Sequence, residues 1–343
     1  RTAPSTTPTR TTRRSWGRSM AIKVQSPGLL TTVQDTGRLG EYAIGMPPSG
    51  AMDVFSYQIG NYLVGNEEGA AGLEITYFGP RLEFTEDAVV AVTGAKMPPK
   101  INGEEVPTWE TLAVESGDVL ALDYLQNGAR AYLAVAGGID VPVFMHSRST
   151  YTLIGLGGHE GRALAEGDEL ALGEAGDRSD RVGMAVVEQQ IPHYSKEAEL
   201  RVIIGLASYR LTEESMEAFL NTTWTVTTDA DRVGYRYKGG ELGFLEREQP
   251  AGAGADQANV VDFGYPVGSI QVPGGVEPIV LMNDAVTGGG YATIGTVISA
   301  DRDRLAQTKT NDKTRFRSVD LEEALAAREQ RRKQMAEIKE ALS

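Results

Sequence analysis

The sequence predicts a mainly β protein with a few helices, built from β-barrels or β-sandwiches. Short strand-like runs recur at regular spacing between Gly, Asp and Pro residues, and they do not alternate with helices in a βαβ pattern. The 343 residues include 40 glycines and 15 prolines, a content typical of a chain with many tight turns. This length allows two domains with separate cores.

The chain divides into an N-terminal leader, two domains and a C-terminal helix. We expect an N-terminal β-barrel domain over residues 20–190, a polar link near 189–199, a C-terminal barrel domain over 196–318 and a charged helix over 319–343. Residues 1–19 differ from the rest because they hold five arginines and no acidic residue. Their basic, Ser/Thr-rich composition resembles a transit peptide. We expect a disordered leader there, either an extension from a misplaced start codon or an expression remnant.

Helix signals occur at three places, where an N-capping residue precedes apolar residues at helical spacing or a charged run. The expected helices cover 53–64 with Asp53 as N-cap, 212–220 with Thr212 as N-cap, and 320–342 with Asp320 as N-cap. The capping position gives Asp53 a structural role as an alternative to a catalytic one.

Composition excludes several classes of function. The chain has no cysteine, which rules out disulfides, thiolate catalysis and Cys-zinc sites. A formal charge of −14 argues against nucleic acid as the main partner. No apolar run approaches the roughly 20 residues of a membrane helix, so a cytoplasmic protein is expected. No P-loop, dinucleotide fingerprint or HExxH motif occurs, and the three histidines lack metal-ligand spacing, so no metal site is predicted.

The stretch over residues 31–53 is the first candidate site. It places polar groups of both signs on a loop that Pro47-Pro48 and two glycines constrain, and binding sites often use such loops. The polar residues are Gln34, Asp35, Arg38, Ser49 and Asp53. The alternative is a surface loop in which Asp35 and Arg38 merely pair with each other.

Three further polar clusters lie at predicted strand ends. They comprise Ser147 and Arg148 in an SRST run, Asp231, Arg232 and Tyr235 in a DRVGYR run, and Gln271 with Asp284, Gly289 and Tyr291 around a glycine-rich segment. Hydroxyls beside an arginine suit an oxyanion. Arg232 has the geometry to fork onto a carboxylate, or an Asp-Arg pair closes a hairpin there. Successive glycines either turn amides toward one anion or form a plain mobile loop.

Motifs over most of residues 20–316 resemble one known family. TTVQDTGR, GMPPSGAMD, LVGNEEGAAGLE, YLAVAGGIDVP, SRST, DRVGYR and SIQVP occur in that order. This pattern resembles the family known as allophanate hydrolase subunit 2, the 5-oxoprolinase C subunit or kinase-inhibitor antagonist. Two segments depart from it: Met145-His146 replaces the usual Leu-Gly, and 286–291 replaces a segment with two threonines and two glycines.

The resemblance implies two cyclophilin-like β-barrel domains with a site between them. It assigns Asp35, Arg38 and Asp53 as catalytic residues, with the carboxylates moving protons. The substrate- or anion-binding residues would be Gln34, Ser49, Ser147, Arg148, Asp231, Arg232, Tyr235, Gln271, Asp284, Gly289 and Tyr291. The resemblance assigns no metal.

It also implies a non-autonomous subunit of an ATP-dependent 5-oxoprolinase, which opens 5-oxo-L-proline to L-glutamate. The partners would be a smaller homologous subunit and a third subunit, and the complex would use ATP although this chain has no nucleotide motif. One alternative is the carboxyltransferase component of a biotin-dependent, urea carboxylase-type system, with the biotin carried on another protein. Another is a non-enzymatic regulator that sequesters the smaller subunit.

Overall fold

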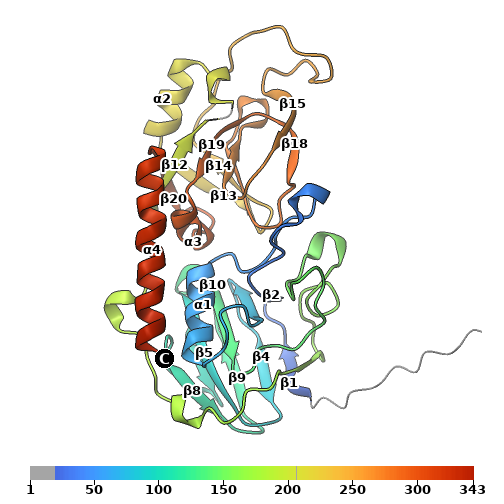
Figure 1. The fold of residues 1–343 in the computed structure, drawn as a ribbon, viewed down its shortest axis with the longest axis vertical. Coiled ribbons are helices and arrows are strands. Elements are labelled where there is room, and N and C mark those ends of the chain that lie inside the picture. Colours follow the sequence, from blue (N-terminus) through green and yellow to red (C-terminus); the bar gives the residue numbers. More distant parts are fainter. Residues whose placement is uncertain (1–19, 206) are drawn as a thin grey trace, which may run out of the picture.

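The computed structural model describes residues 20–205 and 207–343, so the leader predicted over 1–19 lies outside the described residues. Figure 1 shows two β-rich halves stacked along the long axis, with one long helix, α4 (Leu321–Ala341), running beside both of them. The prediction of a mainly β fold with a few helices is confirmed.

Two sheets make up the N-terminal half. The six-stranded sheet has the order β11-β1-β4-β9-β6-β7 and contains β1 (Met20–Ser26), β4 (Arg81–Phe84), β6 (Pro99–Ile101), β7 (Glu104–Glu105), β9 (Val119–Leu122) and β11 (Glu169–Ala171). The five-stranded sheet has the order β2-β3-β10-β5-β8 and contains β2 (Leu30–Gln34), β3 (Gly72–Thr76), β5 (Ala88–Lys96), β8 (Thr111–Val114) and β10 (Asn127–Val135). Leu73 and Val92 of one sheet share a core with Leu82 and Leu120 of the other. The strands therefore enclose one core as two sheets rather than as one closed barrel.

The C-terminal half is a closed barrel, as expected. Its strands are β12 (Glu197–Ile204), β13 (Trp224–Ala230), β14 (Gly234–Lys238), β16 (Ser269–Gln271), β17 (Ile279–Leu281), β19 (Thr293–Val297) and β20 (Lys313–Ser318). Parallel pairing of β12 with β20 completes the ring. Aromatic residues pack against it, with the rings of Phe219 and Phe316 stacked at 4.8 Å. A separate ribbon pairs β15 (Asn259–Gly264) with β18 (Gly288–Tyr291).

The three predicted helices all form, each with the predicted cap. Asp53 accepts a hydrogen bond from the Ser56 amide at the start of α1 (Val54–Leu63). Thr212 caps α2 (Glu213–Asn221) in the same way, and Asp320 caps α4. A fourth, short helix, α3 (Arg302–Ala306), was not predicted. Within the described ranges, no helix is both long enough and apolar enough to cross a membrane.

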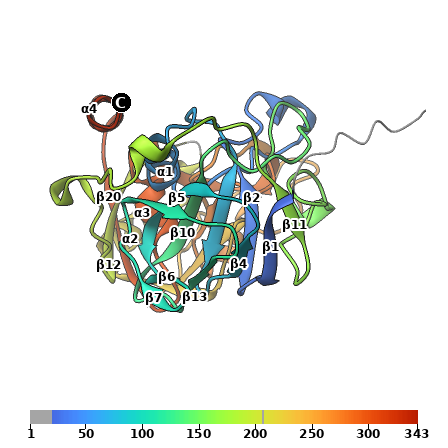
Figure 2. The same cartoon turned by 90° about the horizontal axis from the view of Figure 1, so that it is seen from below.

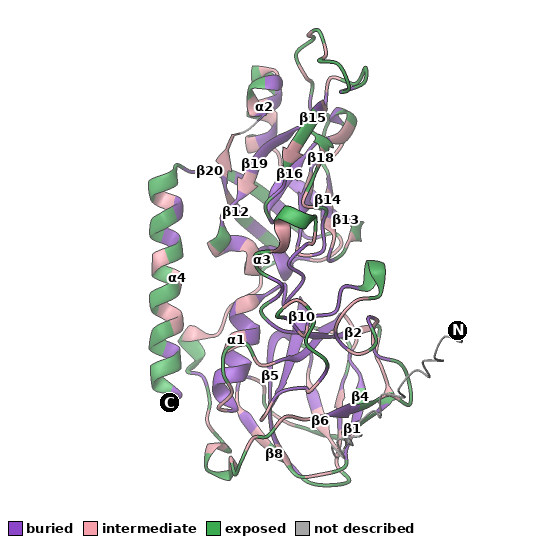
Figure 3. Cartoon of the chain, turned by 45° about the vertical axis from the view of Figure 1, so that its right-hand side comes forward, coloured by how far each residue is buried: buried purple, intermediate pink, exposed green. Residues whose placement is uncertain are grey.

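Helices α1 and α4 differ in their surroundings. Helix α1 packs on β5 and β10, and α4 packs against α1 and against the turn Ser299–Asp301. Figure 2 shows α4 end-on at the periphery of the molecule. Most of α1 is buried, whereas α4 is largely exposed with a narrow buried stripe that includes Ala327 and Ile338 (Figure 3). The sparse apolar residues of α4 are therefore enough to dock it along both halves.

Candidate active site at the domain junction

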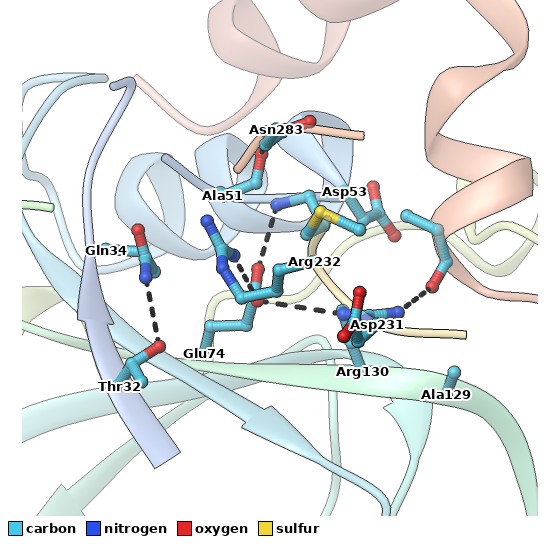
Figure 4. A network of polar contacts seen from close by, with 12 residues as sticks. Thr32, Gln34, Ala51, Asp53, Glu74, Ala129, Arg130, Asp231, Arg232 and Asn283 are labelled. Carbon is cyan, nitrogen blue, oxygen red and sulfur yellow. Dashed lines mark hydrogen bonds and ion pairs between the residues drawn. The ribbon is translucent and has the colours of Figure 1, made fainter. Parts of the chain in front are cut away.

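A buried network of charged side chains joins the two halves (Figure 4). Glu74 lies in the middle of β3 and is only 1% exposed. Its carboxylate accepts a hydrogen bond of 2.6 Å from Nη1 of Arg232 and lies 3.7 Å from Nε of Arg130. The Met52 amide and the Tyr132 hydroxyl each donate to it at 2.8 Å. A carboxylate of the N-terminal half is thus matched to an arginine of the barrel.

Arg232 is saturated with partners. Its Nε donates to Asp284 at 2.8 Å, a second nitrogen donates to the same carboxylate at 3.2 Å, and Nη2 also reaches the Gly50 carbonyl at 2.8 Å. Burial disfavours the guanidinium charge, but the carboxylates of Asp284 and Glu74 outweigh it and raise the pKa of Arg232. The pKa of Glu74 is lowered, because Arg232 and Arg130 together outweigh the effect of its burial. Both groups are held in their charged forms.

Asp35 fastens the SRST loop to the stretch 31–53. Its carboxylate accepts hydrogen bonds from the hydroxyls of Ser147 and Ser149 and from the amides of Gly37 and Arg148. Asp35 is buried and has these loop partners, and Arg38 is fully buried beside it. The interpretation of this stretch as a surface loop with an Asp35–Arg38 pair is therefore wrong.

Arg38 is fully buried but forms few hydrogen bonds. Its Nη2 donates to the Ser149 carbonyl, while its Nε and Nη1 find no hydrogen-bond acceptor among the described residues. The Phe144 ring lies 6.0 Å away, and a side chain at Gly157, where φ is +66°, would collide with the guanidinium. Burial lowers the pKa of Arg38, against the attraction of Asp35 and Asp284. A buried donor without an acceptor calls for an explanation, and a bound water, ion or ligand atom supplies one.

Two other buried polar atoms of the same stretch lack partners. Gln34 donates to Thr32 at 3.0 Å and to the Thr150 carbonyl at 3.2 Å, but its Oε1 accepts nothing from the described residues. The Oγ of Ser49 is also buried and without a partner there. Ser49 has a φ of +53°, a conformation unusual for a residue with a side chain.

Asp53 and Asp303 surround the start of α1. Asp53 accepts hydrogen bonds from the Ser56 hydroxyl at 2.6 Å and from Gln307 at 2.7 Å. Asp303 accepts one from the Val54 amide at 2.8 Å and pairs with Arg331 of α4. Burial, with the nearby charge of Asp53, raises the pKa of Asp303 to about 7 against the opposing effect of Arg331. Both carboxylates line a cavity of about 410 Å³.

Several predicted residues lie outside this junction network. Asp231 is exposed and accepts hydrogen bonds from the amides of its own turn, and Arg148 donates to the Val141 carbonyl at 3.0 Å. Gln271 is buried on β16. Tyr235, by contrast, belongs to the network, because its hydroxyl on β14 of the barrel accepts a hydrogen bond of 2.6 Å from Arg130 on β10 of the N-terminal half.

The glycine-rich segment is not an anion-binding loop. Gly289 and Tyr291 belong to strand β18, which pairs antiparallel with β15. Tyr291 is 43% exposed, and none of the three glycines in this strand has a positive φ. Extended backbone alternates its amides between opposite sides, so they do not converge on one anion. The prediction of a glycine loop here is wrong.

Five residues of the junction were not predicted from the sequence: Glu74, Arg130, Arg302, Asp303 and Gln307. Two of them had a recognisable pattern, because Glu74 interrupts the apolar run GLEIT and Arg130 interrupts ARAYLAV. A charged residue inside a buried strand needs a buried partner. The other three lie in or beside the unpredicted helix α3 and had no such pattern.

Comparison with known proteins identifies relatives over nearly the whole chain. The family model described as carboxyltransferase domain, subdomain A and B, matches residues 44–318. The chain is 37% identical over 317 residues to the 5-oxoprolinase C subunit of Escherichia coli (strain K12), covering 92% of this chain and 97% of that protein. It is 32% identical to urea amidolyase of Saccharomyces cerevisiae, covering 90% of this chain but only 17% of that protein.

The structural comparison agrees. The crystal structure of the Kluyveromyces lactis urea carboxylase matches with a TM-score of 0.88 and 32% identity, covering 94% of this chain and 29% of that one. Sequence and structure point to the same group, and the chain belongs to the carboxyltransferase domain family, subdomains A and B.

Proposed function

We propose that this chain is a subunit of an ATP-dependent 5-oxoprolinase, which adds water across the lactam C–N bond of 5-oxo-L-proline to give L-glutamate. The observation that carries the proposal is the 37% identity spanning 97% of a protein named as the C subunit of 5-oxoprolinase. A similar relative from Haemophilus influenzae has the same name, with 32% identity over 91% of its length. The word "subunit" in both names supports partner subunits, and we assign these as a smaller homologous subunit and a third subunit.

Arg38 is the residue we place against the substrate or an anionic intermediate. Two of its nitrogens have no acceptor among the described residues, and the surrounding burial strengthens an ionic contact. Arg232 differs, because Asp284, Glu74 and Gly50 already accept hydrogen bonds from it. It would therefore position the junction rather than contact the substrate.

Asp35 and Asp53 stay the predicted proton carriers. Asp53 lines a cavity of about 410 Å³, which favours it as the proton carrier. Asp35 accepts four hydrogen bonds, three of them from the SRST loop, which favours a positioning role. Asp53 also accepts four, so the cavity beside it is what separates the two carboxylates.

The N-termini of α1, α2 and α4 do not fit the phosphates of a nucleotide. Carboxylates occupy the N-terminal amides of α1, through Asp53 and Asp303, and two glutamates lie in the first turn of both α2 and α4. Negative charge at these ends opposes phosphate binding. We therefore place ATP on another subunit and derive no step through it.

Reconstitution tests the proposal. The full chain is mixed with the two partner subunits, and 5-oxoproline-dependent ATP hydrolysis is measured. We expect turnover in the full mixture, an Arg38→Met variant that loses at least about 100-fold in kcat/KM, equivalent to about 2.7 kcal/mol, and an Arg315→Met control that retains it. Arg315 is exposed on β20 and donates to the Thr223 hydroxyl. Absence of turnover in the complete mixture, with related lactams also inert, would refute the proposal.

A second candidate is the carboxyltransferase component of a biotin-dependent system. The TM-score of 0.88 to urea carboxylase, over 94% of this chain, favours it. Supplying carboxylated biotin on its carrier protein and measuring carboxyl transfer to urea distinguishes the two candidates. Transfer without 5-oxoproline-dependent ATP hydrolysis would select the second.

A further inference from the structure

A groove between α1, α4 and the end of the barrel converges on Arg302. The groove has a volume of about 810 Å³ and is lined by Arg302, the first residue of α3, and by Ser49. A second hollow of about 450 Å³ shares Leu39, Pro48, Val267 and Arg302 with the groove. Arg302 therefore lines both hollows.

Arg302 has no partner in the described part of the chain. It is half-buried, its Nε is fully buried without an acceptor, and no hydrogen bond or ion pair involves its other nitrogens. The neighbouring Asp303 forms no ion pair with it, because that carboxylate accepts from the amides of Val54 and Phe55 and pairs with Arg331. Burial lowers the pKa of Arg302, and the attraction of Tyr42 and Asp303 does not outweigh it. A desolvated, unpaired guanidinium is unfavourable unless an anion meets it.

The remaining charges of the groove compensate one another. The pairs are Arg331 with Asp303, Arg332 with Glu329 at 2.7 Å, and Lys339 with Glu68 at 3.6 Å. Among the described residues that line the groove, this leaves the positive charges of Arg302 and Arg328 without an ion pair. The local excess of positive charge contrasts with the net charge of −14 for the chain.

Ser49 lines the same groove. Its backbone is fixed by Asn283, which accepts from the Ser49 amide at 2.9 Å and donates to the Ser49 carbonyl at 3.1 Å. Its buried hydroxyl has no partner among the described residues. We propose that Arg302 and Ser49 form a binding site for a small oxyanion, a carboxylate or phosphate group, in the groove beneath α4.

The chemistry follows from the donors. A guanidinium presents several N–H groups in one plane, which match the oxygens of a carboxylate or phosphate, and a hydroxyl adds one more donor. The proposed site needs no other subunit. It holds whether or not the chain takes part in 5-oxoproline hydrolysis.

Calorimetric titration of the full chain at low ionic strength tests the site. Inorganic phosphate and acetate are the two probes, and they separate a phosphate-selective site from a carboxylate-selective one. We expect saturable binding of at least one probe and at least a 10-fold weaker affinity in Arg302→Met. Ser49→Gly, which keeps the positive φ but removes the hydroxyl, should weaken binding about 3- to 10-fold.

Arg304→Met is the matched control, because Arg304 lies on the same helix but is exposed and donates to the Glu199 carbonyl. It should bind the probes as the unmodified chain does. Thermal unfolding of each variant verifies folding, and Arg302→Lys should recover part of the affinity if charge is what matters. Binding that is unchanged in Arg302→Met, equally lost in Arg304→Met, or absent for both probes would overturn the proposal.

Discussion

Two arginine environments at the domain junction contrast sharply. Arg232 is buried with all its charge matched by Glu74 and Asp284, whereas Arg38 and Arg302 keep buried nitrogens without acceptors in the described part of the chain. The first environment spans both halves of the molecule, and in the second Arg302 lines a groove between them. Removing one partner of a matched pair leaves a buried charge uncompensated, while a buried donor without an acceptor is available to a bound group. The comparison separates structural from functional residues of the same chemical type.

Among the substitutions in the paired network, we expect Glu74→Gln to lower the free energy of unfolding the most. The change leaves Arg232 and Arg130 buried with less compensating charge, which costs about 3–5 kcal/mol when a buried pair is broken. Urea denaturation should show this loss in the free energy of unfolding. Glu104→Gln, on the exposed strand β7, is the control and should change stability little. Equal effects of the two substitutions would contradict the role of the network.

Asp303 offers a second test, because it lies next to the unpaired Arg302 and is itself paired with Arg331. Its pKa of about 7 in the folded chain exceeds the ordinary value of 3.8, so the folded state binds the proton more tightly. This contribution to stability is largest at low pH and is lost as the pH rises toward about 7, by about 2 kcal/mol between pH 5.5 and 8.

Unfolding free energies of the unmodified chain and of Asp303→Asn, measured across that range, test the effect. The difference between the two proteins should shift in favour of the Asn variant as the pH rises. The titratable groups that face Asp303 are Asp53, Arg331, Arg302 and Tyr194. A difference independent of pH would rule out titration of Asp303 in this interval.

Exchanging each arginine for methionine compares the two environments directly. Arg232→Met removes the cation that pairs with the carboxylates of Glu74 and Asp284. Arg302→Met removes a charge that has no ion pair among the described residues. We expect Arg302→Met to change the free energy of unfolding by no more than about 1 kcal/mol, or to stabilise the chain slightly. A loss in Arg302→Met as large as in Arg232→Met, measured in the same denaturation experiment, would remove the distinction.

The smallest effect is expected on the exposed face of α4. Glu329 pairs there with Arg332 at 2.7 Å, and both side chains are largely in solvent. Surface pairs of this kind contribute little because water screens them. Glu329→Gln should leave the urea midpoint unchanged, and a clear shift would indicate that α4 docks through this pair.

Local sequence predicted the helices well and the charged network poorly. Asp53, Thr212 and Asp320 identified three helix starts because a cap and the turn that follows it are only a few residues apart. Helix α3, with five residues, was too short to show a helical period. The loop predicted over residues 288–291 is a strand, because glycine permits both conformations and pairing with β15 stabilises the strand.

The sequence by itself determined the mainly β class, the helix caps and the polar stretch that contains Arg38. Only the tertiary structure decided which charges meet, because Glu74 and Arg232 are 158 residues apart along the chain. It also decided that Asp35 holds the SRST loop and that Arg302 is left without a partner in the described part of the chain. The physical reason is that burial and long-range pairing set the energy of a charge, and neither is encoded in the residues next to it.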